Sequence, residues 1–253
     1  DDGNDDAGAS VTLTVRGSSF SDNTSVGSGG AISGQVLTGD LALTISNSTF
    51  SGNKALYSSA GAIAASFGHA SDDNGGTPSA AGSVTVTGST FSGNSAAGGG
   101  GAIITSSAYA PLPLTVTGST FSGNSAKLFG GAISATAIGE NTESSVTITH
   151  TTLADNTSGT GEGHHLALIG GSPLGGKVEG TATRSIFAHS QPTLAGQFIL
   201  AANGSTFASN RYNVSQRDLP GMAGGDLANT DPLLDPLADN GGPTRTHMLQ
   251  IGS

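Results

Sequence analysis

Metal-ligating side chains gather around one pair of adjacent histidines. The set comprises His150, Asp155, Glu162, His164 and His165. Histidine nitrogens and carboxylate oxygens together are a ligand set that Zn²⁺ accepts. Neighbouring residues of a strand face opposite sides, so His164 and His165 cannot both bind one ion without a bend. We therefore take His164 as the metal-ligand candidate, and surface histidines in an irregular repeat as the simpler interpretation.

Aspartates near both ends of the chain offer the oxygen ligands that Ca²⁺ prefers. One group lies in residues 1–6, and the other comprises Asp231, Asp235 and Asp239. Neither group follows the twelve-residue calcium loop with its closing glutamate. The sequence thus predicts no cofactor except a candidate structural Ca²⁺.

Carboxylates placed for catalysis are sparse in the regular part of the chain. Polysaccharide hydrolysis needs two facing carboxylates. Only Asp22 and Asp155 share a repeat position, and glycines hold that position in the three repeats between them. The two cannot form a pair, so we predict no catalytic residue and a protein that is not an enzyme. A Ca²⁺-dependent polysaccharide lyase or glycosidase is kept as the alternative function.

Four similar repeats and a fifth, degenerate one would position these side chains. Each contains an alternating apolar/Thr stretch, then Phe-x-x-Asn, then Gly-Ala-Ile. Such self-similarity is typical of a solenoid, and alternation at spacing two indicates strands with one buried face. The sequence predicts an all-β fold, a right-handed parallel β-helix of about seven coils. Residues 1–216 would form the β-helix, and residues 217–253 an irregular Pro- and Asp-rich capping or exit segment.

Two residue types recur at positions that should stack inside the β-helix. An inward phenylalanine column adds ring contacts to apolar burial. An inward asparagine column satisfies its amides by bonding from coil to coil. The predicted ladder residues are Phe20, Phe50, Phe91 and Phe121, with Asn23, Asn53, Asn94, Asn124 and Asn156. Glycines before Ala-Ile suit a corner with positive φ and little room for a Cβ atom.

Outward positions of the alternating stretches are mostly threonine. The array comprises Thr14, Thr44, Thr85, Thr87, Thr115, Thr117, Thr147 and Thr149. Flat hydroxyl and methyl arrays of this kind resemble those of β-solenoid ice-binding proteins, so ice or surface binding is a second alternative function. The simpler explanation is that threonine suits the outer face of a strand.

Charge, composition and insertions narrow the choice of partners. A formal net charge of -10 argues against nucleic acid and anionic membranes as partners. No apolar run approaches the roughly 18 residues of a membrane helix, so this fragment should not insert into a membrane. The absence of cysteine is compatible with export.

Segments after each Gly-Ala-Ile vary in length and should leave the β-helix at one corner as a ridge of binding loops. They are residues 33–40, 64–83, 104–113 and 134–145.

The paired motifs also carry a family resemblance. Phe121 to Asn124 with Gly130-Gly-Ala-Ile133 resembles the repeat of chlamydial polymorphic outer membrane proteins and related bacterial β-helix surface proteins. The segment from Asp231 onward is similar to the one that introduces the choice-of-anchor Q region of secreted bacterial β-helix proteins. The resemblance implies an exported bacterial protein, extracellular or at the cell surface and autotransporter-like. We expect a structural or adhesive role, a surface glycan or protein as ligand, and end-to-end stacking into filaments.

Overall fold

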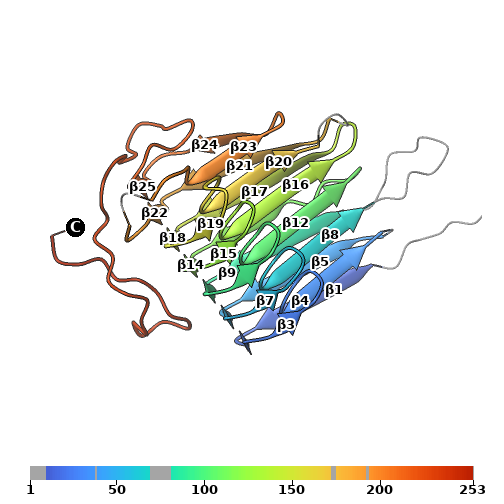
Figure 1. Ribbon diagram of the computed structural model, residues 1–253, viewed down its shortest axis with the longest axis horizontal. Helices are drawn as coiled ribbons and strands as arrows, with labels where there is room; N and C mark the ends of the chain where they lie inside the picture. The colour runs from blue at the N-terminus through green and yellow to red at the C-terminus, as the bar shows by residue number, and fades with distance from the viewer. Residues whose placement is uncertain (1–9, 38, 69–80, 172–174, 192–193, 253) are drawn as a thin grey trace, which may run out of the picture.

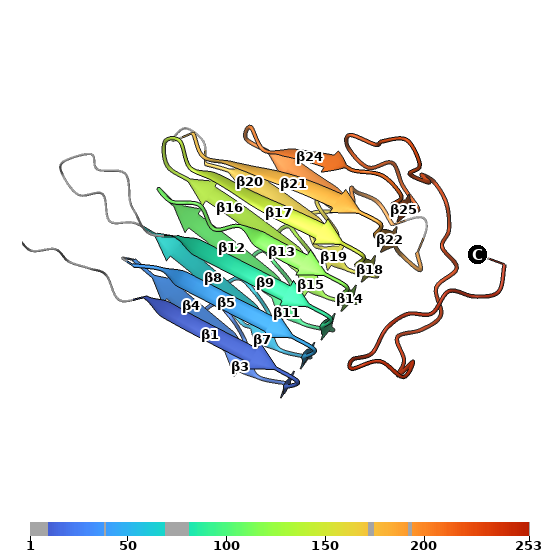
Figure 2. The ribbon, with the colours of Figure 1, turned by 180° about the vertical axis from the view of Figure 1, so that it is seen from behind.

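The computed structural model describes residues 10–37, 39–68, 81–171, 175–191 and 194–252. Within these residues the regular elements are all strands, and they stack as the coils of a parallel β-helix (Figures 1 and 2). Each strand pairs in parallel with the equivalent strand of the next coil, which produces four sheets. The predicted fold class is confirmed.

Sheets A and B contain seven strands each. Sheet A consists of β1 (Val11–Arg16), β5 (Leu41–Ser46), β9 (Gly82–Thr87), β13 (Leu114–Thr117), β17 (Glu143–Thr149), β21 (Lys177–Thr183) and β24 (Thr206–Ser209). Sheet B consists of β2 (Ser19–Ser21), β6 (Thr49–Ser51), β10 (Thr90–Ser92), β14 (Thr120–Ser122), β18 (Thr152–Ala154), β22 (Ile186–Ala188) and β25 (Val214–Ser215).

Sheets C and D are smaller, with five and six strands. Sheet C consists of β3 (Thr24–Ser25), β7 (Lys54–Ala55), β11 (Ser95–Ala96), β15 (Ser125–Ala126) and β19 (Thr157–Ser158). Sheet D consists of β4 (Ile32–Val36), β8 (Ile63–Gly68), β12 (Ile103–Ala108), β16 (Ile133–Ile138), β20 (Leu166–Gly170) and β23 (Ile199–Ala202).

The core follows from the alternation in sheet A and the aromatic residue in sheet B. Val84 and Val86 are buried, whereas Thr85 and Thr87 lie on the outer face. Phe91 stacks on Phe121 with ring centroids 4.8 Å apart and planes 4° from parallel. The same centroid spacing joins the rings of the first three coils. The four phenylalanines therefore form one column, which is fully buried at Phe50, Phe91 and Phe121 and partly exposed at Phe20.

The two glycines before Ala-Ile have separate functions at the corner between sheets C and D. Gly130 has a φ of +64°, which disfavours side chains with a Cβ atom. Gly131 lacks a positive φ, but a Cβ atom there would lie 2.3 Å from the carbonyl oxygen of His164 in the next coil. One position thus needs glycine for its backbone angle, and the other needs it for close approach between coils.

The predicted ridge of loops is wrong, because the strands of sheet D occupy the first part of these segments. The segments after Gly-Ala-Ile do not leave the β-helix at once, because β4, β8, β12 and β16 occupy their first residues. The isoleucine of Gly-Ala-Ile is the first residue of a strand whose first, third and fifth side chains are buried, as in β12 and β16. The loops proper are short, such as residues 109–113 and 139–142. The longest predicted insertion lies mostly outside the described residues.

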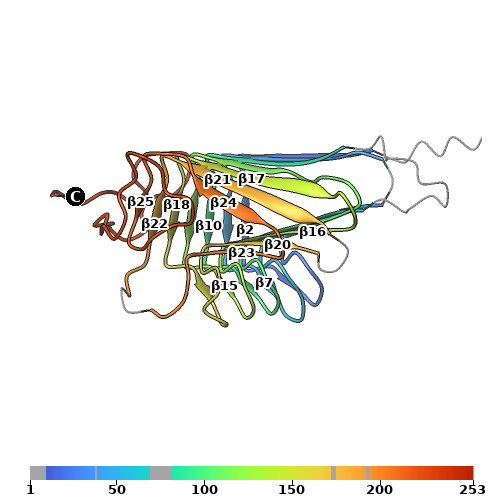
Figure 3. The ribbon, with the colours of Figure 1, turned by 90° about the horizontal axis from the view of Figure 1, so that it is seen from above.

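The segment after residue 216 does more than cap the last coil. Residues 217–227 cover that coil, with Leu219 buried at 5% exposure. Residues 228–252, here called the strap, then run back along the outside of the β-helix (Figures 1 and 3). Antiparallel bridges join Leu234 to Leu249 and Ala238 to Thr246, which makes the strap an irregular hairpin.

Candidate functional site

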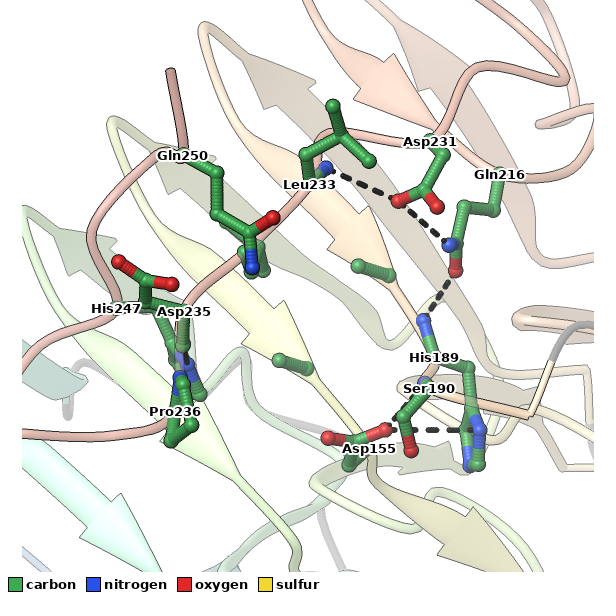
Figure 4. A pocket seen from close by; sticks show the side chains of 13 residues that line it. Asp155, His189, Ser190, Gln216, Asp231, Leu233, Asp235, Pro236, His247 and Gln250 are labelled. Carbon is green, nitrogen blue, oxygen red and sulfur yellow. Dashed lines mark hydrogen bonds and ion pairs between the residues drawn. The ribbon is translucent and has the colours of Figure 1, made fainter. Parts of the chain in front are cut away.

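A pocket of about 460 Å³ lies between the strap and the ends of β18 and β22 (Figure 4). Its polar lining includes Asp155, His189, Gln216, Asp231 and His247. Asp231 Oδ1 accepts hydrogen bonds from Gln216 Nε2 at 3.1 Å and from the N–H of Leu233 at 3.0 Å. Gln216 Oε1 in turn accepts from the N–H of His189. The pocket wall is therefore a hydrogen-bonded link between the strap and the sixth coil.

The strap is fixed to the β-helix far from the last coil. Thr244 Oγ1 donates to the carbonyl oxygen of Gly88 at 3.1 Å, and Thr90 Oγ1 donates to the carbonyl oxygen of Arg245 at 2.5 Å. His247 Nε2 lies 3.0 Å from Ser122 Oγ, while its Nδ1 donates to the carbonyl oxygen of Asp235 at 2.7 Å. The pocket thus has one wall from residues 154–190 of the β-helix and one from residues 231–250 of the strap.

His164 and His165 are buried, which overturns the simpler interpretation of these two histidines as surface residues, whereas His150 and Glu162 are exposed. His164 is 1% exposed and His165 is fully buried. His164 Nδ1 accepts from the N–H of Ser158 at 3.0 Å, and Nε2 donates to the carbonyl oxygen of Ala195 at 2.8 Å. His165 Nδ1 lies 3.2 Å from the amide nitrogen of Asn156, the last residue of the asparagine ladder. His164 therefore uses both ring nitrogens in internal hydrogen bonds, whereas His165 uses only Nδ1.

Burial keeps two of these rings neutral. Desolvation, followed by repulsion from His189 and His164, lowers the pKa of His165 well below its ordinary 6.5. Desolvation also lowers the pKa of His189, although the carboxylate of Asp155, 3.6 Å from Nδ1, acts in the opposite direction. The Nε2 atoms of His165 and His189 are buried without a hydrogen-bond partner. His165 and His189 are therefore neutral side chains packed inside a corner of the β-helix.

The candidate metal ligands are not brought together. Asp231 and Asp235 line the pocket, but Asp239 lies farther along the strap and accepts from the N–H of Gly241 at 3.0 Å. His164 uses both ring nitrogens within the protein. Among the described residues, no three His, Asp or Glu side chains are grouped to hold a metal ion. The aspartates of residues 1–6 lie outside the described part of the chain.

The asparagine ladder is complete over five coils. Asn94, for example, donates its N–H to Asn124 Oδ1 at 3.0 Å and its Nδ2 to the same oxygen at 2.9 Å. Its Nδ2 also donates to the carbonyl oxygen of Phe50 at 3.0 Å. Equivalent bonds connect the remaining members, and four of the five asparagines are fully buried. The buried amides are therefore satisfied along the stack.

A second, hydroxyl ladder was not predicted from the sequence. The N–H of Ser48 donates to Ser89 Oγ at 3.1 Å, and each hydroxyl donates to the carbonyl oxygen two residues earlier. Its members are Ser18, Ser48, Ser89, Ser119, Thr151 and Ser185, followed by Asn213 and Asp226. In the sequence, this ladder corresponds to a Ser or Thr two residues before each Phe of sheet B, or before Leu153 in the fifth coil.

The threonine array forms two straight columns on the outer face of sheet A. Register places Thr44, Thr85, Thr115 and Thr147 in line, and Thr181 extends this column. The second column contains Thr87, Thr117 and Thr149, continued by Thr183. Unlike the hydroxyl ladder, the predicted threonines make no side-chain hydrogen bond to any described residue.

Comparison with known families finds a match for three of the repeats. Residues 17–35, 88–106 and 118–136 match the Chlamydia polymorphic membrane protein repeat. Three of the coils are thus similar to this repeat. Each matched repeat begins at a left-handed glycine, at Gly17, Gly88 or Gly118, and continues through sheets B and C into sheet D. The repeat is thus three sides of one coil. No curated protein and no solved structure gives a significant match to the chain.

No described segment forms a helix long and apolar enough to cross a membrane.

Proposed function

We propose that this chain is part of an exported bacterial surface protein in which the β-helix serves as a non-catalytic, adhesive stalk. The similarity of three coils to the Chlamydia polymorphic membrane protein repeat is the observation that carries the proposal, because that repeat is named for a family of bacterial membrane proteins. Two continuous hydrogen-bonded ladders support a rigid, extended body. Solenoids of this kind present long surfaces to extended ligands.

A groove on sheet C is the surface that best fits adhesion. It has a volume of about 390 Å³ and spans four coils. Lys54, Ser95, Ser125 and Thr157 are aligned in one row of its lining, and Lys127 lies beside them. Both lysines are exposed and form no ion pair with a described residue. Two free ammonium groups and three hydroxyls favour an acidic glycan as ligand.

Glycan-array binding of the purified chain tests the adhesive function. We expect binding to acidic glycans that weakens at least tenfold in Lys54→Glu/Lys127→Glu. The matched control is Lys177→Glu, because Lys177 lies outside the groove and pairs with Glu143 at 3.0 Å. Absence of binding to every glycan and every extracellular matrix protein would contradict adhesion. Equal loss in the control would show an effect of net charge alone.

The threonine array favours ice or another ordered surface as a second candidate ligand. Its hydroxyls are aligned, outward and uncommitted, and neighbouring strands are about 4.8 Å apart. Thermal hysteresis measures this function directly. Replacement of Thr85 and Thr115 by Lys should abolish the effect, and Lys54→Glu/Lys127→Glu should leave it intact. Freezing behaviour identical to that of an inert protein would exclude ice binding.

A further inference from the structure

The asparagine ladder has a direction along the β-helix. Each asparagine donates its N–H and one Nδ2 hydrogen to Oδ1 of the asparagine in the next coil. Its other Nδ2 hydrogen donates back to the phenylalanine carbonyl oxygen of the preceding coil, as Asn53 does to Phe20 at 3.0 Å. A coil therefore needs Phe-x-x-Asn on the coil before it to complete the pattern.

The first coil is where this pattern is left incomplete. Asn23 donates to Asn53 Oδ1 through its N–H at 3.1 Å and through Nδ2 at 2.8 Å. Among the described residues nothing donates to Asn23 Oδ1, and nothing accepts the second Nδ2 hydrogen of Asn23. Asn23 is exposed, whereas the other four asparagines are fully buried. Its free acceptor and free donor point where a preceding coil would lie.

Apolar side chains are exposed at the same end of the β-helix. Val11 is 42% exposed and Leu13 is 39% exposed, although the equivalent Leu41 and Leu43 of the second coil are buried. Phe20 stacks on Phe50 by one ring face only, and it is partly exposed where Phe50 is fully buried. We call this surface of Val11, Leu13, Phe20 and Asn23 the N-terminal face.

The opposite end of the β-helix does not offer a matching surface. The asparagine ladder ends at Asn156, whose Nδ2 meets His165 Nδ1. The hydroxyl ladder ends at Asp226, whose carboxylate accepts the N–H of Asn213 at 2.9 Å. Residues 217–227 then cover the last coil. Head-to-tail stacking of identical chains would therefore place a charged, covered end against the N-terminal face.

We propose that the N-terminal face is a docking surface for one β-helix coil that carries Ser-x-Phe-x-x-Asn in register. The asparagine of that coil donates its N–H and Nδ2 to Asn23 Oδ1, and its phenylalanine carbonyl accepts from Asn23 Nδ2. Its phenylalanine ring covers Phe20, and the N–H of its serine donates to Ser18 Oγ, as Ser18 itself donates to Ser48 at 3.2 Å. The surface thereby selects the repeat motif over other strands.

A chain extended by one coil tests the proposal. In this variant a second copy of residues 11–40 precedes Val11, so that the added coil has the 30-residue period between Phe20 and Phe50. The matched control carries aspartate for asparagine at the ladder position of the added coil only. An aspartate carboxylate cannot donate to Asn23 Oδ1 and repels it. In both variants we measure the rate of hydrogen exchange at the amides of the original Val11–Arg16 strand.

We expect exchange of these amides to slow at least tenfold in the extended chain, and to remain close to the parent rate in the aspartate control. The proposal is overturned if the added coil gives no protection, or if the control protects equally well. Sedimentation of the parent chain tests whether a second copy of the chain binds the N-terminal face instead. A dimer that protects Val11–Arg16 and dissociates in Asn23→Asp would show that a second copy takes this surface, and would also overturn the assignment.

Discussion

The backbone N–H of Asn213 donates to Oδ1 of Asp226 at 2.9 Å, and so repeats at the last coil the bond that each ladder serine makes with the coil above it. Asp226 also accepts from the N–H of Ala223 at 2.7 Å. Burial alone would raise the pKa of Asp226, but these hydrogen bonds outweigh it and lower the pKa below the ordinary 3.8. The carboxylate acts as the closing member of the ladder.

Replacement of Asp226 by Ala should therefore destabilise the last coil. The loss of charge-assisted bonds from Asn213 and Ala223 should cost about 2 kcal/mol in the free energy of unfolding. Because the folded-state pKa is lowered, the contribution of Asp226 is present above pH 3.8 and is lost as the pH falls below it. Urea denaturation at pH 7 and pH 3 measures both effects. An equal difference between variant and parent at the two pH values would contradict this assignment.

Replacement of Asn94 by Leu interrupts the asparagine ladder at its centre. The change leaves the N–H and Nδ2 of Asn53 without an acceptor, and Asn124 Oδ1 keeps only the backbone N–H of residue 94 as a donor. Buried unsatisfied groups cost about 1–3 kcal/mol each, so we expect a loss of about 3 kcal/mol or more. Asn23→Leu is the matched control, because it removes one side-chain hydrogen bond at an exposed end and leaves Asn53 Oδ1 the backbone N–H of residue 23. Similar losses in both variants, measured by urea denaturation, would contradict a cooperative ladder.

His165 should make the β-helix less stable in mild acid. Because its folded-state pKa lies well below 6.5, the unfolded chain binds the proton more tightly. Stability from the neutral ring is complete above pH 6.5 and decreases below it, by up to about 1.4 kcal/mol per pH unit until the folded-state pKa is reached. His165→Gln keeps an acceptor for Asn156 and removes the titration, so its stability should depend less steeply on pH. Unfolding free energies between pH 5 and 8 provide the comparison.

His247 should hold the strap on sheet B. In His247→Ala the strap loses its contacts with Ser122 and with the carbonyl oxygen of Asp235. We expect limited proteolysis within residues 228–252 to become at least tenfold faster, while the β-helix unfolds at an unchanged temperature. Met248→Ala is the matched control, because Met248 is adjacent and 53% exposed. Protease resistance equal to that of the parent would mean that the other contacts are sufficient.

The sequence alone determined the repeat unit and what it must bury. Val84, Phe91 and Asn94 recur at fixed spacing, and a strand has only two faces, so their inward direction followed from local rules. The same rules could identify Ala-Ile as apolar. They could not predict that a strand of sheet D continues from this motif, because an Ala- and Ser-rich strand lacks a clear alternation.

Tertiary structure decided the features that join distant residues. The hydroxyl of Ser89 is a ladder member only because Ser48 lies one coil away, and serine is common in loops and turns as well. The burial of His165 depends on the coils around it, and the path of the strap depends on Ser122 and Gly88, which no local pattern connects to His247 and Thr244. Periodicity fixes what each coil presents to its neighbours, whereas the irregular segments are placed by whichever surfaces the stacked coils leave open.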